Sequence, residues 1–155
     1  MDVRLAMEWE ERRKVEHFRI RYEFNGEEHA CRVDGKDARD AKKQALKDKG
    51  AKIISCRKLY PFSTEKNQHN FELIRNICMN RIYDMDSGDI PYDAEEMKRL
   101  YEIKAKADKY WCLPLPVAWL EWEEYEEARE LVVGAREHRA NACIENGRPD
   151  LVKYC

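Results

Sequence analysis

Hydrophobic and polar residues alternate strictly over residues 15–24, and a period of two predicts a half-buried β-strand. Asn25 and Gly26 follow, and this dipeptide favours the positive φ angles of a two-residue hairpin turn. A second strand is therefore expected over residues 27–33. The turn fixes four cross-strand pairs: Phe24 with Glu27, Tyr22 with His29, Ile20 with Cys31, and Phe18 with Val33.

The pattern then changes to a helical one, with small apolar residues spaced three and four apart after Asp37. Asp37 is the expected N-cap of this helix, and Gly50 is its expected stop. Residues 51–60 predict a third strand. A short amphipathic helix is expected over residues 2–14.

After Pro61 the apolar spacing is helical throughout. Ser63 or Thr64 is expected to cap a helix that runs to about Tyr83. Asp93 is expected to cap a second helix that runs to about Trp111. Pro114 and Pro116 predict an extended link, since proline fixes φ and restrains the residue before it.

A last helix is predicted from about Val117 to Asn146. The fold class is therefore α+β: an N-terminal ββαβ unit with an antiparallel hairpin, followed by about three helices packed on the sheet. The domain organisation expected is a ββαβ unit over residues 1–60, preceded by the short helix, and a helical region over residues 61–155 that shares one core with it. A sheet this small needs that cover.

Composition adds a heavily charged surface: 39% of the 155 residues are charged, and the formal net charge is −2. The two signs are unevenly distributed. Residues 1–60 contain 16 Lys and Arg against 12 Asp and Glu, whereas residues 61–155 contain 13 against 19. No apolar run is long enough for a membrane span, and no secretory signal is visible, so a cytoplasmic protein is expected.

The six cysteines are scattered, and no CxxC pair occurs. They are expected to be free thiols in a reducing compartment, without a structural zinc site or other cofactor.

The stretch from Asp84 to Glu96 resembles a calcium loop in composition but not in spacing. With Asp84 at the first position of a twelve-residue loop, the glycine falls fifth, whereas the turn of such a loop needs it sixth. Asp93 as a helix cap, with Glu95 and Glu96 in the first turn, explains these carboxylates without a metal ion.

The strongest candidate interface is the acidic and aromatic start of the last helix. An array of carboxylates with aromatic anchors suits a basic surface on another protein, although a solvated helix with a core stripe explains the pattern as well. The candidate partner-binding residues are Trp119, Trp122, Glu123, Glu124, Tyr125, Glu126, Glu127 and Glu130.

The outer face of the hairpin gives an alternative, because Arg19, Arg21 and Arg32 gather there and would suit a nucleic acid backbone. The hairpin aromatics fall on the opposite face, so the stacking platform of a nucleic-acid binder is not predicted. The same arginines would equally suit the chain's own acidic helix. Direct nucleic-acid binding is therefore the second hypothesis.

A third hypothesis is an enzyme without a recognisable motif, or a small-ligand sponge. No Walker loop, GxGxxG, GxSxG or HExxH sequence occurs, and no histidine stands in a motif with serine or cysteine. We therefore expect no catalytic residues and a protein that is not an enzyme.

The segment from His17 to Lys58 resembles small ββαβ modules of phage and mobile-element proteins of gut Firmicutes. The resemblance lies in the NG turn, the helix opening Asp37-Ala38 and Asp40-Ala41, and the strand entry GAKI. It covers about a quarter to a third of the chain. It implies a counter-defence accessory protein of the anti-CRISPR type. Such a protein would inhibit a bacterial nucleic-acid-handling complex, such as a Cas protein, by steric and electrostatic blocking.

Overall fold

The computed structural model describes residues 15–45 and 50–155. The helix expected over residues 2–14 lies outside the described residues. The chain forms two compact units. The first contains the described residues up to Pro61 together with Trp119–Trp122, and the second contains Phe62–Ala118 together with Glu123–Cys155.

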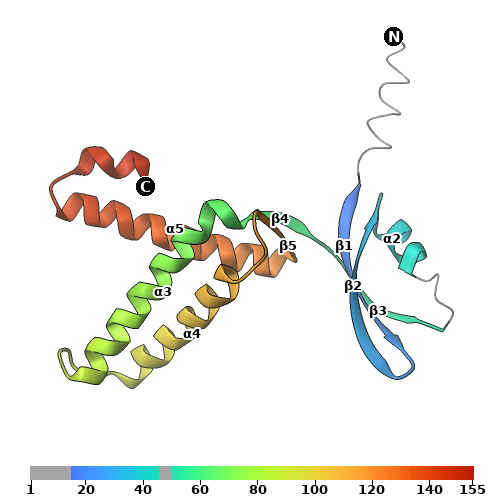
Figure 1. Cartoon of the computed structure of the whole chain (residues 1–155), viewed down its shortest axis with the longest axis horizontal. Coiled ribbons are helices and arrows are strands. Elements are labelled where there is room, and N and C mark those ends of the chain that lie inside the picture. The colour runs from blue at the N-terminus through green and yellow to red at the C-terminus, as the bar shows by residue number, and fades with distance from the viewer. Residues whose placement is uncertain (1–14, 46–49) are drawn as a thin grey trace, which may run out of the picture. The chain divides into compact units, whose positions relative to one another are not determined.

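The first unit contains an antiparallel sheet of three strands: β1 (Glu16–Phe24), β2 (Glu27–Gly35) and β3 (Lys52–Lys58), in the order β2-β1-β3 (Figure 1). Asn25 and Gly26 have φ angles of 53° and 79°, as the predicted turn requires. All four predicted cross-strand pairs are present. The hairpin prediction is confirmed in both turn and register.

Helix α2 (Ala38–Ala45) covers one face of this sheet, where Phe18, Ile20 and Ala41 form the buried cluster. The backbone N–H of Asp40 donates to Asp37 Oδ1 over 2.8 Å, which confirms Asp37 as the cap. Gly35 allows the close approach of α2, because a Cβ atom there would lie 2.9 Å from the backbone nitrogen of Ala41.

Two further strands, β4 (Tyr60–Ser63) and β5 (Val117–Leu120), pair with each other. The prediction that the last helix starts at about Val117 is therefore wrong, since Val117–Leu120 is a strand and the helix begins at Trp122. The reason is that β4 supplies backbone partners for a segment whose apolar residues also suit a strand. The predicted third strand is likewise divided, since β3 ends at Lys58 and β4 begins at Tyr60.

In the second unit, α3 (Thr64–Ser87) and α4 (Ala94–Trp111) run side by side around a core that includes Ile82, Met85 and Met97 (Figure 1). The Asp93 side chain accepts hydrogen bonds from the N–H groups of Glu95 and Glu96, so its predicted capping role is confirmed. The carbonyl of Pro116 accepts from the N–H groups of Thr64 and Glu65, which satisfies two of the donors that the start of α3 leaves open.

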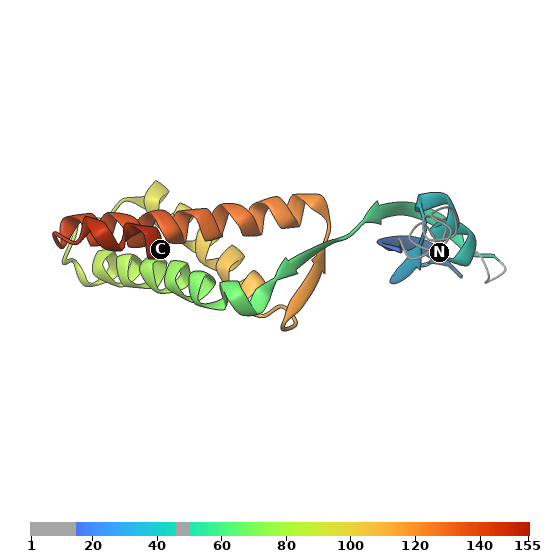
Figure 2. The ribbon, with the colours of Figure 1, turned by 90° about the horizontal axis from the view of Figure 1, so that it is seen from above.

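Helix α5 (Trp122–Glu145) crosses the α3–α4 pair, and the 3₁₀-helix η1 (Pro149–Tyr154) turns back beside its end (Figures 1 and 2). The antiparallel sheet followed by helices confirms the α+β class. Each unit has its own buried residues, and a core common to sheet and helices stays a prediction. Among the described residues, no helix has the length and apolar character needed to cross a membrane.

Candidate functional site

The acidic start of α5 divides into an inner and an outer set of glutamates. Glu124 lies 3.4 Å from Lys109 Nζ, and Glu127 lies 3.9 Å from Lys106 Nζ. The hydroxyl of Tyr110 donates to Glu127 Oε1 over 2.9 Å. These two half-buried carboxylates therefore join α5 to α4 rather than face a partner.

The Tyr110 hydroxyl is suited to this role because it stays protonated. Its side chain is fully buried, and burial raises the pKa of the phenol far above its ordinary value. The hydrogen bond to Glu127 raises this pKa further, because it stabilises the neutral form. Tyr110 is thus a permanent donor at the inner face of α5.

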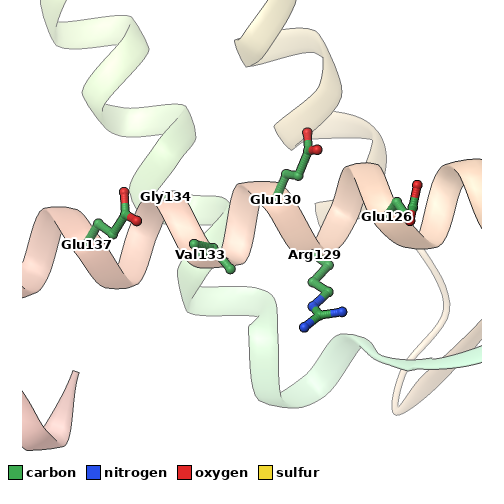
Figure 3. Close-up of a pocket in the computed structure, with 6 residues that line it drawn as sticks. All are labelled: Glu126, Arg129, Glu130, Val133, Gly134 and Glu137. Atoms are coloured by element: carbon green, nitrogen blue, oxygen red, sulfur yellow. The ribbon is translucent and has the colours of Figure 1, made fainter.

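The outer set consists of Glu126, Glu130 and, further along, Glu137, at intervals of four and seven residues that place them on one face of the helix. All three are exposed, and no ion pair joins them to another residue in the described part of the chain. Figure 3 shows them on one side of α5 and Arg129 on the other.

An open groove of about 400 Å³ follows this outer face. Its six lining residues all come from α5: Glu126, Arg129, Glu130, Val133, Gly134 and Glu137 (Figure 3). Val133, at the middle, is 44% exposed. The groove therefore combines a carboxylate row with an exposed aliphatic side chain.

Gly134 occupies the centre of α5, where a glycine destabilises a helix by about 1 kcal/mol relative to alanine. Its φ is not positive, and a Cβ atom built there meets no heavy atom within 4 Å. Neither backbone conformation nor packing against the described residues therefore requires glycine. Gly134 also lines a second pocket, together with Ile74 of α3 and Ile103 of α4.

The aromatic residues predicted as anchors are largely engaged within their own units. The Trp119 ring contacts the His17 ring, with centroids 4.0 Å apart and planes tilted by 51°, and the Arg32 guanidinium lies 4.7 Å from the Trp119 ring centroid. Trp122 is 46% exposed and packs edge-on against Tyr60. Tyr125 packs against Phe62 in the second unit.

Of the remaining predicted partner residues, Glu123 is exposed and has a partner within the chain. The structure thus leaves Glu126 and Glu130 as the predicted glutamates that line the open groove. Val133, Gly134 and Glu137 were not among the predicted site residues. Their helical spacing from Glu126 could have placed them on the same face of α5. The sequence alone, however, does not show which face of the helix the other elements leave uncovered.

The arginine face of the hairpin is occupied by the returning segment 119–121. Arg19 lies opposite Arg32 on β2 and Arg57 on β3, so three arginines cross the sheet in one row. Glu121, only 7% exposed, accepts two hydrogen bonds from Arg21, of 3.1 and 3.3 Å, and lies 3.5 Å from Arg19. Sequence reasoning placed the arginines correctly but did not identify Glu121 as their counter-ion.

A second ion-pair cluster adjoins this face at His17. His17 Nδ1 lies 2.5 Å from Asp34 Oδ1, and the Arg32 guanidinium lies 3.6 Å from the same oxygen. The hydrogen bond with His17 and the charges of His17 and Arg32 lower the pKa of the Asp34 carboxyl below its ordinary value, against a smaller opposing effect of desolvation. Asp34 is thus held ionised beside Arg32, which also covers Trp119.

The acidic stretch around Gly88 shows helix-end geometry. Gly88 has a φ of 82° and ends α3, with its N–H donating to the carbonyl of Met85. The Ser87 hydroxyl donates to the Asp84 carbonyl, and Asp93 caps α4. In the part of the chain that the structure describes, no three His, Cys, Asp or Glu residues gather as metal ligands would.

Comparison with protein-family models, with curated proteins and with solved structures finds no match to this chain.

Proposed function

We propose that the chain is a non-enzymatic binding module whose outer α5 face docks against a basic surface of a partner protein. The groove residues Glu126, Glu130 and Glu137 would receive lysine or arginine side chains, and Val133 would bury an aliphatic contact between them. The proposal corresponds to the acidic-helix hypothesis, restricted to the glutamates that do not bind α4.

The observation that carries the proposal is Gly134. Gly134 lies between the carboxylates of the groove, where glycine destabilises the helix. No described residue lies close enough to exclude a side chain at this position. A helix backbone that is open at this point lets a partner approach more closely than alanine or any larger residue would allow. A partner that approaches the α5 backbone closely gains contact area beyond that of the carboxylates alone.

The resemblance of the N-terminal module to mobile-element proteins suggests the kind of partner. A nucleic-acid-handling effector, such as a Cas protein, carries basic channels for its nucleic acid. An acidic helix face would compete with the nucleic acid for such a channel. Inhibition of a bacterial defence complex is the specific form of the proposal.

A charge-reversal pair tests the groove. Glu126→Lys with Glu130→Lys should reduce capture of the partner from bacterial lysate at least tenfold, because both contacts become repulsive. The matched control is Glu72→Lys with Glu102→Lys, which changes the net charge equally on exposed positions of α3 and α4. Equal capture by both double variants, with helicity unchanged, would exclude the groove.

Nuclease treatment separates this proposal from the nucleic-acid hypothesis. A protein partner that docks on α5 is retained after nuclease digestion, and its retention depends on Glu126 and Glu130. Proteins that are lost after digestion would instead indicate binding through nucleic acid. The ion pairs of Arg19 and Arg21 with Glu121, and of Arg32 with Asp34, favour the protein partner, since all three candidate phosphate contacts already have a carboxylate.

A further inference from the structure

Two cysteines of the second unit lie in direct contact. Cys143, near the end of α5, has its sulfur 3.8 Å from the sulfur of Cys155, next to η1. Both side chains are partly accessible, and both thiols are free. A disulfide bond needs the two sulfurs about 2 Å apart, so a movement of under 2 Å brings these two to bonding distance.

The local fold creates this contact. Gly147 adopts a φ of 72°, and its N–H donates to the carbonyl of Ile144. The N–H of Arg148 donates to the carbonyl of Cys143 over 2.8 Å, which closes the helix in a Schellman-type turn. Pro149 then starts η1, and the chain runs back until Cys155 faces Cys143. The sulfurs meet because hydrogen-bonded backbone on both sides holds them there.

We propose that Cys143 and Cys155 are a reversible dithiol site, which a low-molecular-weight disulfide such as oxidised glutathione converts to an intramolecular disulfide bond. The bond would fasten η1 to the end of α5. This inference does not depend on the proposed function of the outer α5 face.

The reaction proceeds by two thiol–disulfide exchanges. The Cys143 thiolate attacks one glutathione sulfur, forms a mixed disulfide and releases one glutathione thiolate. The Cys155 thiolate then attacks the Cys143 sulfur, forms the protein disulfide and releases the second glutathione. The two cysteines lose two protons and two electrons, and one glutathione disulfide becomes two glutathione thiols.

The order of attack follows from the surroundings of Cys155. Desolvation raises the pKa of the Cys155 thiol, and its hydrogen bond and charge interaction with Cys143 raise it further. Because a raised pKa disfavours the Cys155 thiolate, we place the first attack at Cys143. Once Cys143 is in a mixed disulfide, it no longer carries the negative charge that opposes ionisation of Cys155.

The remaining described cysteines are not placed for this reaction. Cys31 and Cys56 both lie opposite Ile20, on the two strands that flank β1. Strands two positions apart in a sheet are about 10 Å apart, which exceeds the reach of a disulfide. Cys78 is buried, and Cys112 is exposed.

The test is to equilibrate the full chain in glutathione buffers of increasing oxidised fraction, block free thiols and map disulfides by mass spectrometry of peptides. We expect a 143–155 linkage, with the loss of two hydrogen atoms, that dithiothreitol reverses. Cys143→Ser and Cys155→Ser should each abolish the linkage and leave a glutathione adduct on the other cysteine. Cys112→Ser is the control and should leave the linkage unchanged.

The wild-type map decides the inference without relying on the variants. A stable glutathione adduct on Cys143 or Cys155 that does not close would overturn it, as would linkages found only between two chains. A second readout is limited proteolysis after Arg148 and Lys153, because fastening η1 should slow cleavage there several-fold in the oxidised wild type. Equal cleavage rates in oxidised and reduced protein would show that η1 is not fastened.

Discussion

Glu121 belongs by sequence to the acidic run that opens α5, yet it lies against the sheet arginines. Its carboxylate is nearly inaccessible and forms ion pairs with both Arg19 and Arg21. A two-point contact with Arg21 also fixes the direction of the side chain, as the fork of a guanidinium does. A substitution of Glu121 therefore tests whether its contacts with the sheet arginines contribute to the stability of the fold.

Glu121→Gln should lower the free energy of unfolding by about 1–3 kcal/mol, because it removes the carboxylate charge that pairs with the partly buried guanidinium groups of Arg21 and Arg19. Urea unfolding followed by tryptophan fluorescence measures this change. Glu126→Gln is the control, since an exposed surface substitution should stay within about 0.5 kcal/mol. Equal stabilities of the two variants would contradict the role of Glu121.

Asp34 gives a prediction for acid conditions. Its pKa is lowered in the folded chain, so its contribution to stability is present above the ordinary carboxyl value of 3.8 and is lost as the pH falls through the folded value. Asp34→Asn should therefore be less stable than the wild type at neutral pH. That difference should shrink as the pH falls below about 4.

Denaturant unfolding of both proteins at a series of pH values measures this dependence. Glu28→Gln on the exposed edge of the same hairpin is a suitable control, since Glu28 is an exposed carboxylate on β2. A stability difference between wild type and Asp34→Asn that stays constant down to pH 3 would show that the His17 and Arg32 contacts do not hold the carboxylate.

At the scale of the elements, the sequence predicted correctly those features that neighbouring residues determine, such as turns and helix starts. The turn residues Asn25 and Gly26 fix the hairpin register, and the cap residues Asp37 and Asp93 fix two helix starts. Strand β5 was not predicted because its partner, β4, lies more than 50 residues earlier in the chain. A helical interpretation of Val117–Leu120 satisfied the local pattern equally well, and only the tertiary pairing decided between them.

The candidate site shows the same limit. The sequence identified the acidic helix, but the division into inner and outer glutamates depends on where Lys106, Lys109 and Tyr110 of α4 lie. Those contacts remove Glu124 and Glu127 from the outer face. The periodicity of α5 alone does not show which of its faces α4 covers.

Gly134 supplies the prediction for α5 as an element. Gly134→Ala should raise the free energy of unfolding by about 0.5–1 kcal/mol, because alanine is the better helix former and its methyl group meets open space. Thermal or denaturant unfolding measures the gain. A destabilised Gly134→Ala variant would mean that the site is already filled within the chain. A stabilised variant that binds its partner more weakly would place the partner at Gly134.

At the scale of the whole molecule, the structure shows how the positive and negative parts of the sequence come into contact. The N-terminal 60 residues carry an excess of four positive charges and the remainder an excess of six negative charges. The first unit includes Trp119–Trp122 from the acidic part, so the arginine row is completed by residues distant in sequence. Glu121 and Trp119 would therefore compete with a polyanion for contact with Arg19, Arg21 and Arg32.

Removal of this cover should strengthen binding of the chain to nucleic acid. We expect Trp119→Ala with Glu121→Gln to bind single-stranded DNA at low salt at least tenfold more tightly than the wild type, with affinity falling steeply as salt rises. Fluorescence anisotropy of a labelled oligonucleotide measures this. The matched control, Trp122→Ala with Glu126→Gln, removes the same charge and one tryptophan but leaves Glu121 on the arginines. Equal affinities of the two double variants would show that net charge, and not the uncovered arginine row, governs the binding.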